Sequence, residues 1–168
     1  VFINSVIGSI LFILVGITDC IDGNIARANR QLTIQGNWLD AVSGYFIYGF
    51  QPLAIGIYLE KNNPQDIFSG YWIVCGALIS ILNLLSRVIF QKSLNLINKI
   101  NPKETLNNLK KEFSFGNEIG LVGFMMPFLL MTAIINKLTF YMYFYLALYI
   151  FTFIYVFLSI NKKLKKYS

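Results

Sequence analysis

The stretch T-D-C-I-D-G-N-I-A-R-A-N-R-Q-L-T-I-Q-G-N-W-L-D-A-V-S-G, residues 18–44, lies between two hydrophobic segments that are each about as long as a bilayer crossing requires. Asp19, Asp22 and Asp40 are therefore at or near membrane depth. An ionised carboxylate there costs roughly 2.5–3.5 kcal/mol on insertion scales, so such groups usually face a polar interior and serve a function. This stretch decides both the expected fold and the expected site.

The first half of the stretch combines paired carboxylates with a glycine and an arginine. Asp19 and Asp22 are one helical turn apart. Gly23 and Ala26 lie on the same helical stripe, with Arg27 at its edge. Two such carboxylates repel each other unless a cation lies between them, and a hard divalent ion is the expected occupant. Glycine permits close approach to the backbone, and arginine offers a planar fork to phosphate oxygens. The residues predict a pyrophosphate site.

The pattern resembles the signature of the CDP-alcohol phosphotransferase family, D-x-x-D-G-x-x-A-R-x8-G-x3-D-x3-D. Seven of its eight positions are matched, by Asp19, Asp22, Gly23, Ala26, Arg27, Gly36 and Asp40. The eighth position, an aspartate in the signature, is Gly44. Seven positions at fixed spacing are far more specific than an isolated D-x-x-D-G, which occurs in many turns and calcium loops. The alternative, a polar helix end with two solvated caps, explains neither the spacing nor Asp40.

Composition predicts an integral membrane protein. The chain has 168 residues, of which 56% are hydrophobic and 13% charged, and its mean hydropathy is +0.59. The net charge of +6 comes from residues beside hydrophobic segments, which favours anionic membrane lipids as partners and argues against nucleic acid. The chain has no His, so imidazole catalysis and imidazole metal ligation are excluded. Two cysteines imply neither a disulfide framework nor a zinc site.

The hydrophobic segments predict an all-α, polytopic transmembrane helical bundle with five visible spans. These are about Val1–Thr18, with its helix continuing to about Ala28, then Trp38–Leu59, Ile67–Phe90, Ile119–Ile135 and Leu138–Ile160. A short polar connection, Gln31–Gln35, separates the first two. The many Tyr and Phe of the fifth predict a lipid-facing and interfacial surface. We expect residues 1–168 to form one domain that lacks an N-terminal helix, because the chain begins inside an apolar run. A sixth span would give the number usual in the family.

The only long polar insertion is Gln91–Gly116. Asn101, Pro102 and Glu104 form a capping pattern, and apolar residues follow at helical spacing, so we expect a short amphipathic helix on the cytoplasmic membrane surface. The alternative is a solvated connector. Of the 14 Lys and Arg, all but Lys61 and Lys137 fall on one side of the spans. The positive-inside rule therefore places the motif, this insertion and the C-terminus in the cytoplasm.

The resemblance implies a membrane phosphotransferase of phospholipid biosynthesis. Such an enzyme moves a substituted, phosphatidyl-type phosphate group from a CDP-alcohol, commonly CDP-diacylglycerol, to an acceptor alcohol and releases CMP. It also implies Mg²⁺ or Mn²⁺ as cofactor and a homodimer. On this basis the expected metal ligands are Asp19, Asp22 and Asp40, and the expected nucleotide and phosphate contacts are Gly23, Ala26, Arg27 and Gly36.

The resemblance leaves the general base open. In the family the last aspartate of the signature acts as base on the acceptor hydroxyl, and Gly44 takes its place here. A missing general base costs roughly 10²–10⁴-fold in rate. Glu118, at the start of the fourth span, either serves instead or caps its helix. Otherwise the acceptor is already ionised, or the protein binds nucleotide and metal without efficient turnover.

Arg87, near the end of the third span, is the remaining candidate. With Asn83 one turn earlier it either holds a phosphate of the acceptor or snorkels to the interface.

The rival class of function is a non-catalytic membrane scaffold or channel. The acids of a pore should recur on several spans, whereas here they gather at one end, which disfavours a path through the membrane.

Overall fold

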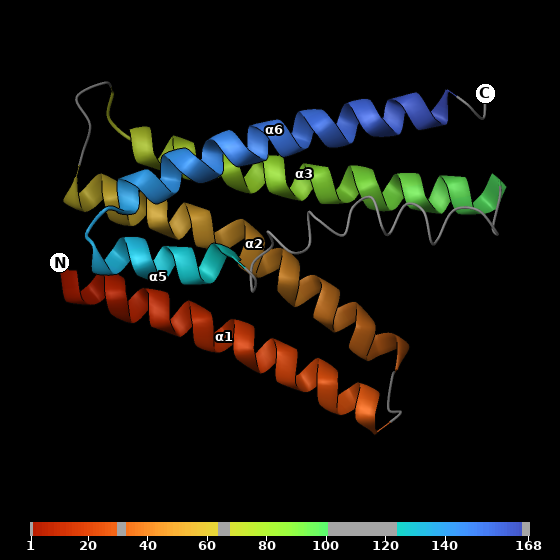
Figure 1. Ribbon diagram of the computed structural model, residues 1–168, viewed down its shortest axis with the longest axis horizontal. Helices are drawn as coiled ribbons and strands as arrows, with labels where there is room; N and C mark the ends of the chain where they lie inside the picture. Colours follow the sequence, from red (N-terminus) through yellow and green to blue (C-terminus); the bar gives the residue numbers. More distant parts are fainter. Residues whose placement is uncertain (1, 30–32, 64–67, 101–123, 166–168) are drawn as a thin grey trace.

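The computed structural model describes residues 2–29, 33–63, 68–100 and 124–165, and within these ranges the protein is all-α (Figure 1). A π-helical turn at residues 124–125 precedes the fourth described helix. The helices are α1 (Phe2–Ala28), α2 (Ile34–Asn62), α3 (Tyr71–Ile100), α5 (Met126–Ile134) and α6 (Leu138–Leu164). The predicted fold class is confirmed for the described part of the chain.

Three of the helices are long and apolar enough to cross a membrane. The candidate spans are Ile34–Asn62, Tyr71–Ile97 and Leu138–Lys162, which match the second, third and fifth spans predicted from the sequence. The first predicted span corresponds to a shorter apolar stretch, Ile3–Thr18, inside α1. That helix runs unbroken through the first half of the motif to Ala28, as the sequence predicts.

The fourth predicted span is described only in part. α5 has 9 residues, about 14 Å of helix against a hydrocarbon core of about 30 Å. Residues 119–123, the predicted amphipathic helix and Glu118 lie outside the described residues. The predicted polar insertion begins too early, because α3 continues ten residues beyond Phe90. Ser93 and Ile97 lie one turn apart on this extension and are both buried. The extension therefore buries one helical face.

The tightest packing joins α2 to α3, at two glycines that face the other helix. A Cβ atom on Gly76 would lie 2.5 Å from the backbone carbonyl oxygen of Pro52, and one on Gly56 would collide with the backbone carbonyl of Trp72. Small residues that let two backbones approach are typical of helix pairs within membranes, where van der Waals packing replaces the hydrophobic driving force. These glycines therefore determine how closely the two helices pack.

Hydrogen bonds reinforce the same helix pair. Ser80 Oγ donates to the backbone carbonyl of Gly49 at 2.6 Å. At the far end, both oxygens of the Glu60 carboxylate accept backbone N–H groups, from Gly70 at 2.6 Å and from Trp72 at 3.0 Å. A carboxylate near the N-terminus of a helix stabilises that helix. Here the carboxylate belongs to the preceding helix. Glu60 thus ties the end of α2 to the start of α3.

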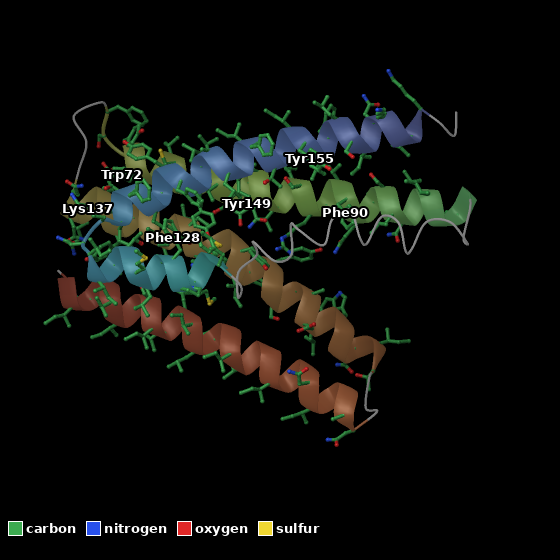
Figure 2. The ribbon with its side chains drawn as sticks, in the orientation of Figure 1. Trp72, Phe90, Phe128, Lys137, Tyr149 and Tyr155 are labelled. Carbon is green, nitrogen blue, oxygen red and sulfur yellow. The ribbon has the colours of Figure 1, made fainter. Side chains whose placement is uncertain are left out.

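The described core lies among α2, α3, α5 and α6. Its fully buried side chains include Trp72, Ile79, Met125, Leu129 and Tyr141. Figure 2 labels Trp72 and Tyr149 of this core, and also Phe128, which packs against it. The prediction that the aromatic residues of the fifth span face lipid is wrong for one stripe of α6. Tyr141, Tyr145 and Tyr149 recur every four residues and are buried, because this stripe faces α3 and α5, whereas Phe140, Phe151 and Tyr155 are exposed.

We expect Gly76→Ala to destabilise the protein by about 1–3 kcal/mol, the usual cost of forcing extra atoms into a packed region. The added methyl group would meet the carbonyl of Pro52. Thermal unfolding in detergent measures the change. Gly8→Ala in α1 is the matched control, since a Cβ there meets nothing within 4 Å. Equal unfolding temperatures for the two variants would contradict the close contact.

Candidate nucleotide and metal site

The two halves of the motif lie at one end of the molecule. Asp19, Asp22, Gly23, Ala26 and Arg27 occupy the last turns of α1, and Gly36, Asp40 and Gly44 occupy the first turns of α2. The two helices run in opposite directions and meet at the short connection between Ala28 and Ile34 (Figure 1). The side chains of the five motif residues on α1 lie outside the described part of the structure.

The start of α2 is fixed by Thr33, which sequence reasoning missed. Its side-chain oxygen accepts the backbone N–H of Gly36 at 2.9 Å, and its backbone is extended, as is usual for an N-cap. A Cβ on Gly36 would lie 3.0 Å from that oxygen. The motif glycine therefore leaves room for the cap. The signal was a threonine three residues before Gly36. The predicted connection Gln31–Gln35 is too long, because the capped helix already begins at Ile34.

Asp40 is exposed on α2, two turns after the cap. Ser43 is also exposed, and its hydroxyl donates to the backbone carbonyl of Asp40 at 2.9 Å. Gly44 is partly buried, and a Cβ added there would meet no atom within 4 Å. Packing among the described residues therefore leaves open space at the position where the signature has an aspartate.

Arg87 points into the helix bundle. Its Nε donates to Oδ1 of Asn83 at 3.1 Å, four residues earlier on α3. Its guanidinium carbon lies 3.5 Å from the centre of the Tyr48 ring, a cation–π contact with α2. Tyr48 follows Gly44 by one helical turn. A snorkelling arginine would reach toward the C-terminal end of α3, whereas this side chain turns back toward its N-terminus. The geometry favours the inward alternative.

Three polar side chains on three helices are deeply buried: Gln51 on α2, Asn83 on α3 and Tyr145 on α6. Each is at most 3% exposed. Gln51 Nε2 contacts the hydroxyl of Tyr141 at 3.5 Å. Gln51 Oε1, Asn83 Nδ2 and the Tyr145 hydroxyl have no hydrogen-bond partner among the described residues. Asn83 also accepts the hydrogen bond from Arg87, so it is a polar neighbour of the guanidinium inside the bundle. The uncharged sequence around Gln51 gave no sign that its side chain is buried.

The residues fit a divalent metal ion by their chemistry. Carboxylate oxygens are the ligands that Mg²⁺ and Mn²⁺ prefer, and the motif brings three aspartates to the connected ends of α1 and α2. Among the described side chains, no group of three or more Asp, Glu or Cys could hold a metal. Asp19 and Asp22 are not among the described side chains.

The fold and motif together define a class: a helical protein with three candidate membrane spans and an acidic motif shared by two connected helix ends. A family model named CDP-alcohol phosphatidyltransferase matches residues 2–160. The chain belongs to this family, so the resemblance drawn from the motif is confirmed. Comparison with curated proteins and with solved structures found no match. Members of the family transfer phosphate groups from CDP-alcohols and typically use a divalent metal.

We expect Thr33→Ala to destabilise the protein by about 1 kcal/mol, the usual cost of losing a helix N-cap. The amide of Gly36 loses its partner, so the turn that carries the motif glycine frays. Thr33→Ser keeps a hydroxyl and is the matched control. Chemical unfolding gives the free energies of both variants. If Thr33→Ser were as unstable as Thr33→Ala, the hydroxyl would not be the stabilising group.

Proposed function

We propose that the protein transfers a substituted, phosphatidyl-type phosphate group from a CDP-alcohol to an acceptor alcohol and releases CMP. The observation that carries the proposal is the placement of the motif. Its two halves occupy the ends of α1 and α2 that are joined along the chain, and Asp40 is exposed on α2, in a chain that belongs to the CDP-alcohol phosphatidyltransferase family. A scaffold or channel would need no such motif at one end of the bundle.

In this proposal Asp19, Asp22 and Asp40 hold Mg²⁺ or Mn²⁺ against the pyrophosphate. The ion, when bound, supplies positive charge where negative charge builds on the departing CMP. Arg27 binds a phosphate oxygen through its planar guanidinium. Gly36 and the small residues of α1, Gly23 and Ala26, keep side chains out of the space that the nucleotide needs.

In this proposal Arg87 binds the acceptor. An inward-facing arginine inside a membrane bundle is energetically costly, so such a residue usually serves a function. Its neighbours on α2 and α3 are the uncharged side chains of Tyr48 and Asn83. A phosphate or carboxylate on the acceptor would supply a negative charge, which these described neighbours of Arg87 do not carry. Arg87 contacts Tyr48, which follows Gly44 by one helical turn; this supports a position of the acceptor hydroxyl between Arg87 and the donor phosphate.

The charge asymmetry of the sequence orients the protein. We place the motif end in the cytoplasm, where anionic lipid headgroups meet the basic ends of α3 and α6. Lys92, Lys99, Lys162 and Lys165 are all exposed there. Homodimerisation remains part of the proposal because the family resemblance implies it.

The first test removes a proposed metal ligand. We expect Asp40→Asn to weaken Mg²⁺-dependent binding of CDP by more than about tenfold, since even the outer partners of metal ligands are worth about 10–100-fold. Calorimetric titration of the purified protein with CDP, with and without EDTA, measures this. Ser43→Ala is the control, because the Ser43 hydroxyl bonds to the backbone of α2. CDP binding insensitive to both EDTA and Asp40→Asn would refute the metal site.

The second test addresses the missing base. We expect Gly44→Asp to raise CMP release from CDP-diacylglycerol at least about tenfold, because the position is open and a positioned base is worth roughly 10²–10⁴-fold. Gly44→Asn is the matched control, since an amide of the same shape cannot take the proton. A loss of rate in Gly44→Asp would instead mean that the glycine makes room for the acceptor. In that case Glu118→Gln in the parent chain decides whether Glu118 is the base.

One alternative keeps the binding site without the reaction. A family member that binds nucleotide and metal but turns over poorly would show metal-dependent CDP binding and gain activity only in Gly44→Asp. Release of CMP by the parent chain, with any acceptor in a panel of phosphorylated and amino alcohols, distinguishes the enzyme from this alternative.

A further inference from the structure

Two buried polar atoms, one on α2 and one on α6, lack a hydrogen-bond partner among the described residues. They are Oε1 of Gln51 and the hydroxyl oxygen of Tyr145, which we call the two orphan atoms. Both side chains are 0% exposed, as is that of Tyr141, so bulk solvent does not reach them. A buried polar group without a partner destabilises a fold, and in a membrane protein the surrounding lipid offers no replacement.

The hydroxyl of Tyr141 lies beside both orphan atoms. Gln51 Nε2 is 3.5 Å from that hydroxyl, farther than the usual N–H···O distance of about 2.9–3.0 Å. The rings of Tyr141 and Tyr145 have their centres 4.5 Å apart, and the two hydroxyl groups are close enough to interact electrostatically. Turning the amide of Gln51 over would exchange its oxygen and nitrogen, so one amide atom lacks a partner in either orientation.

Apolar side chains surround this cluster. Phe128 on α5 has its ring centre 5.9 Å from that of Tyr141 and 6.2 Å from that of Tyr145, and it is labelled in Figure 2. Met142, next to Tyr141 in the chain, is also 0% exposed. A group that satisfies the orphan atoms among such packed side chains must be small. It must also both donate and accept hydrogen bonds, because a carbonyl oxygen only accepts and a hydroxyl group has a proton to donate.

We propose that one buried water molecule bridges Gln51 Oε1 and the Tyr145 hydroxyl and so links α2 to α6 inside the bundle. The water donates to the amide oxygen, accepts from the Tyr145 hydroxyl and has a second proton for the oxygen of Tyr141. Three partners is the number typical of a buried water. The inference does not rest on the proposed function, because none of the three residues belongs to the motif.

The first measurement is a double-mutant cycle on the full chain, unfolded chemically in detergent. Gln51→Met and Tyr145→Phe each remove one orphan atom with little change of shape, and the double variant removes both. Tyr149→Phe is the matched control for Tyr145→Phe. It lies one turn further along the same buried stripe, and its hydroxyl contacts Sδ of Met125 at 3.7 Å, so it has a partner of its own.

We expect Gln51→Met and Tyr145→Phe each to raise the equilibrium constant of unfolding about two- to tenfold, which is the net worth of a typical hydrogen bond. The double variant should raise it by less than the product of the two, whereas Gln51→Met combined with Tyr149→Phe should give the product. An unchanged or smaller constant in Tyr145→Phe would mean that its hydroxyl has no partner, and this would overturn the inference. A full product for Gln51 and Tyr145 would overturn it too, since the two groups would then have separate partners.

The second measurement distinguishes water from a direct bond and uses the parent chain, so it does not depend on a variant that folds. After equilibration in ¹⁸O-labelled water, an X-ray pulse produces hydroxyl radicals from bound as well as bulk water, and these oxidise the side chains next to them. We expect mass spectrometry to find the label in Tyr141 or Tyr145 and not in Met142, although a thioether is oxidised more readily than a phenol.

Two results of this labelling would overturn the inference. Absence of label from both tyrosines would mean that Gln51 and Tyr145 bond to each other directly or to a further side chain. Equal labelling of Met142 would mean that bulk water enters the whole core and that no single site holds it. The proposed function would stand in either case, because metal-dependent binding of CDP tests it separately.

Discussion

The close backbone contact of α2 with α3 is the constraint on which the rest of the described structure depends. Gly56 and Gly76 leave no room for side chains between the two helices, and Ser80 and Glu60 add hydrogen bonds along the same pair. A helix pair held this closely cannot slide without collision. Its register brings Tyr48 under the guanidinium of Arg87. The position of the motif residues on α2 is thus set by packing some distance from them.

The motif end contrasts with this packed region. Asp40 is exposed, and no described atom approaches the Cβ position of Gly44. Within the packed region, atoms of Gln51, Asn83 and Tyr145 are buried and lack partners among the described residues. A ligand site needs polar groups that rigid packing around them holds in place.

Much of the architecture followed from the sequence, because hydrophobic length and periodicity report bilayer crossing directly. The helix through Ala28 and the three long spans were predicted on that basis, and the family was predicted from the spacing of the motif; all three predictions are confirmed. What the sequence hid depends on contacts between distant residues. The buried stripe of α6, the Thr33 cap and the role of Gln51 are set by neighbours, which no local pattern reveals. The metal ligands and Glu118 stay predictions.

Two features of the proposed site, a glycine at position 44 and an inward arginine at 87, are physically compatible. An aspartate at 44 would stand one turn from Tyr48 and would add a second charged group on the part of α2 that Arg87 contacts. Without it, in the proposed reaction, the positive charge of Arg87 acts on the acceptor alone. A cation beside a hydroxyl group favours its ionised form, so the charge proposed to hold an anionic acceptor would also make its hydroxyl easier to deprotonate. In the proposed reaction, an acceptor held by Arg87 depends less on a strong base than one without that contact.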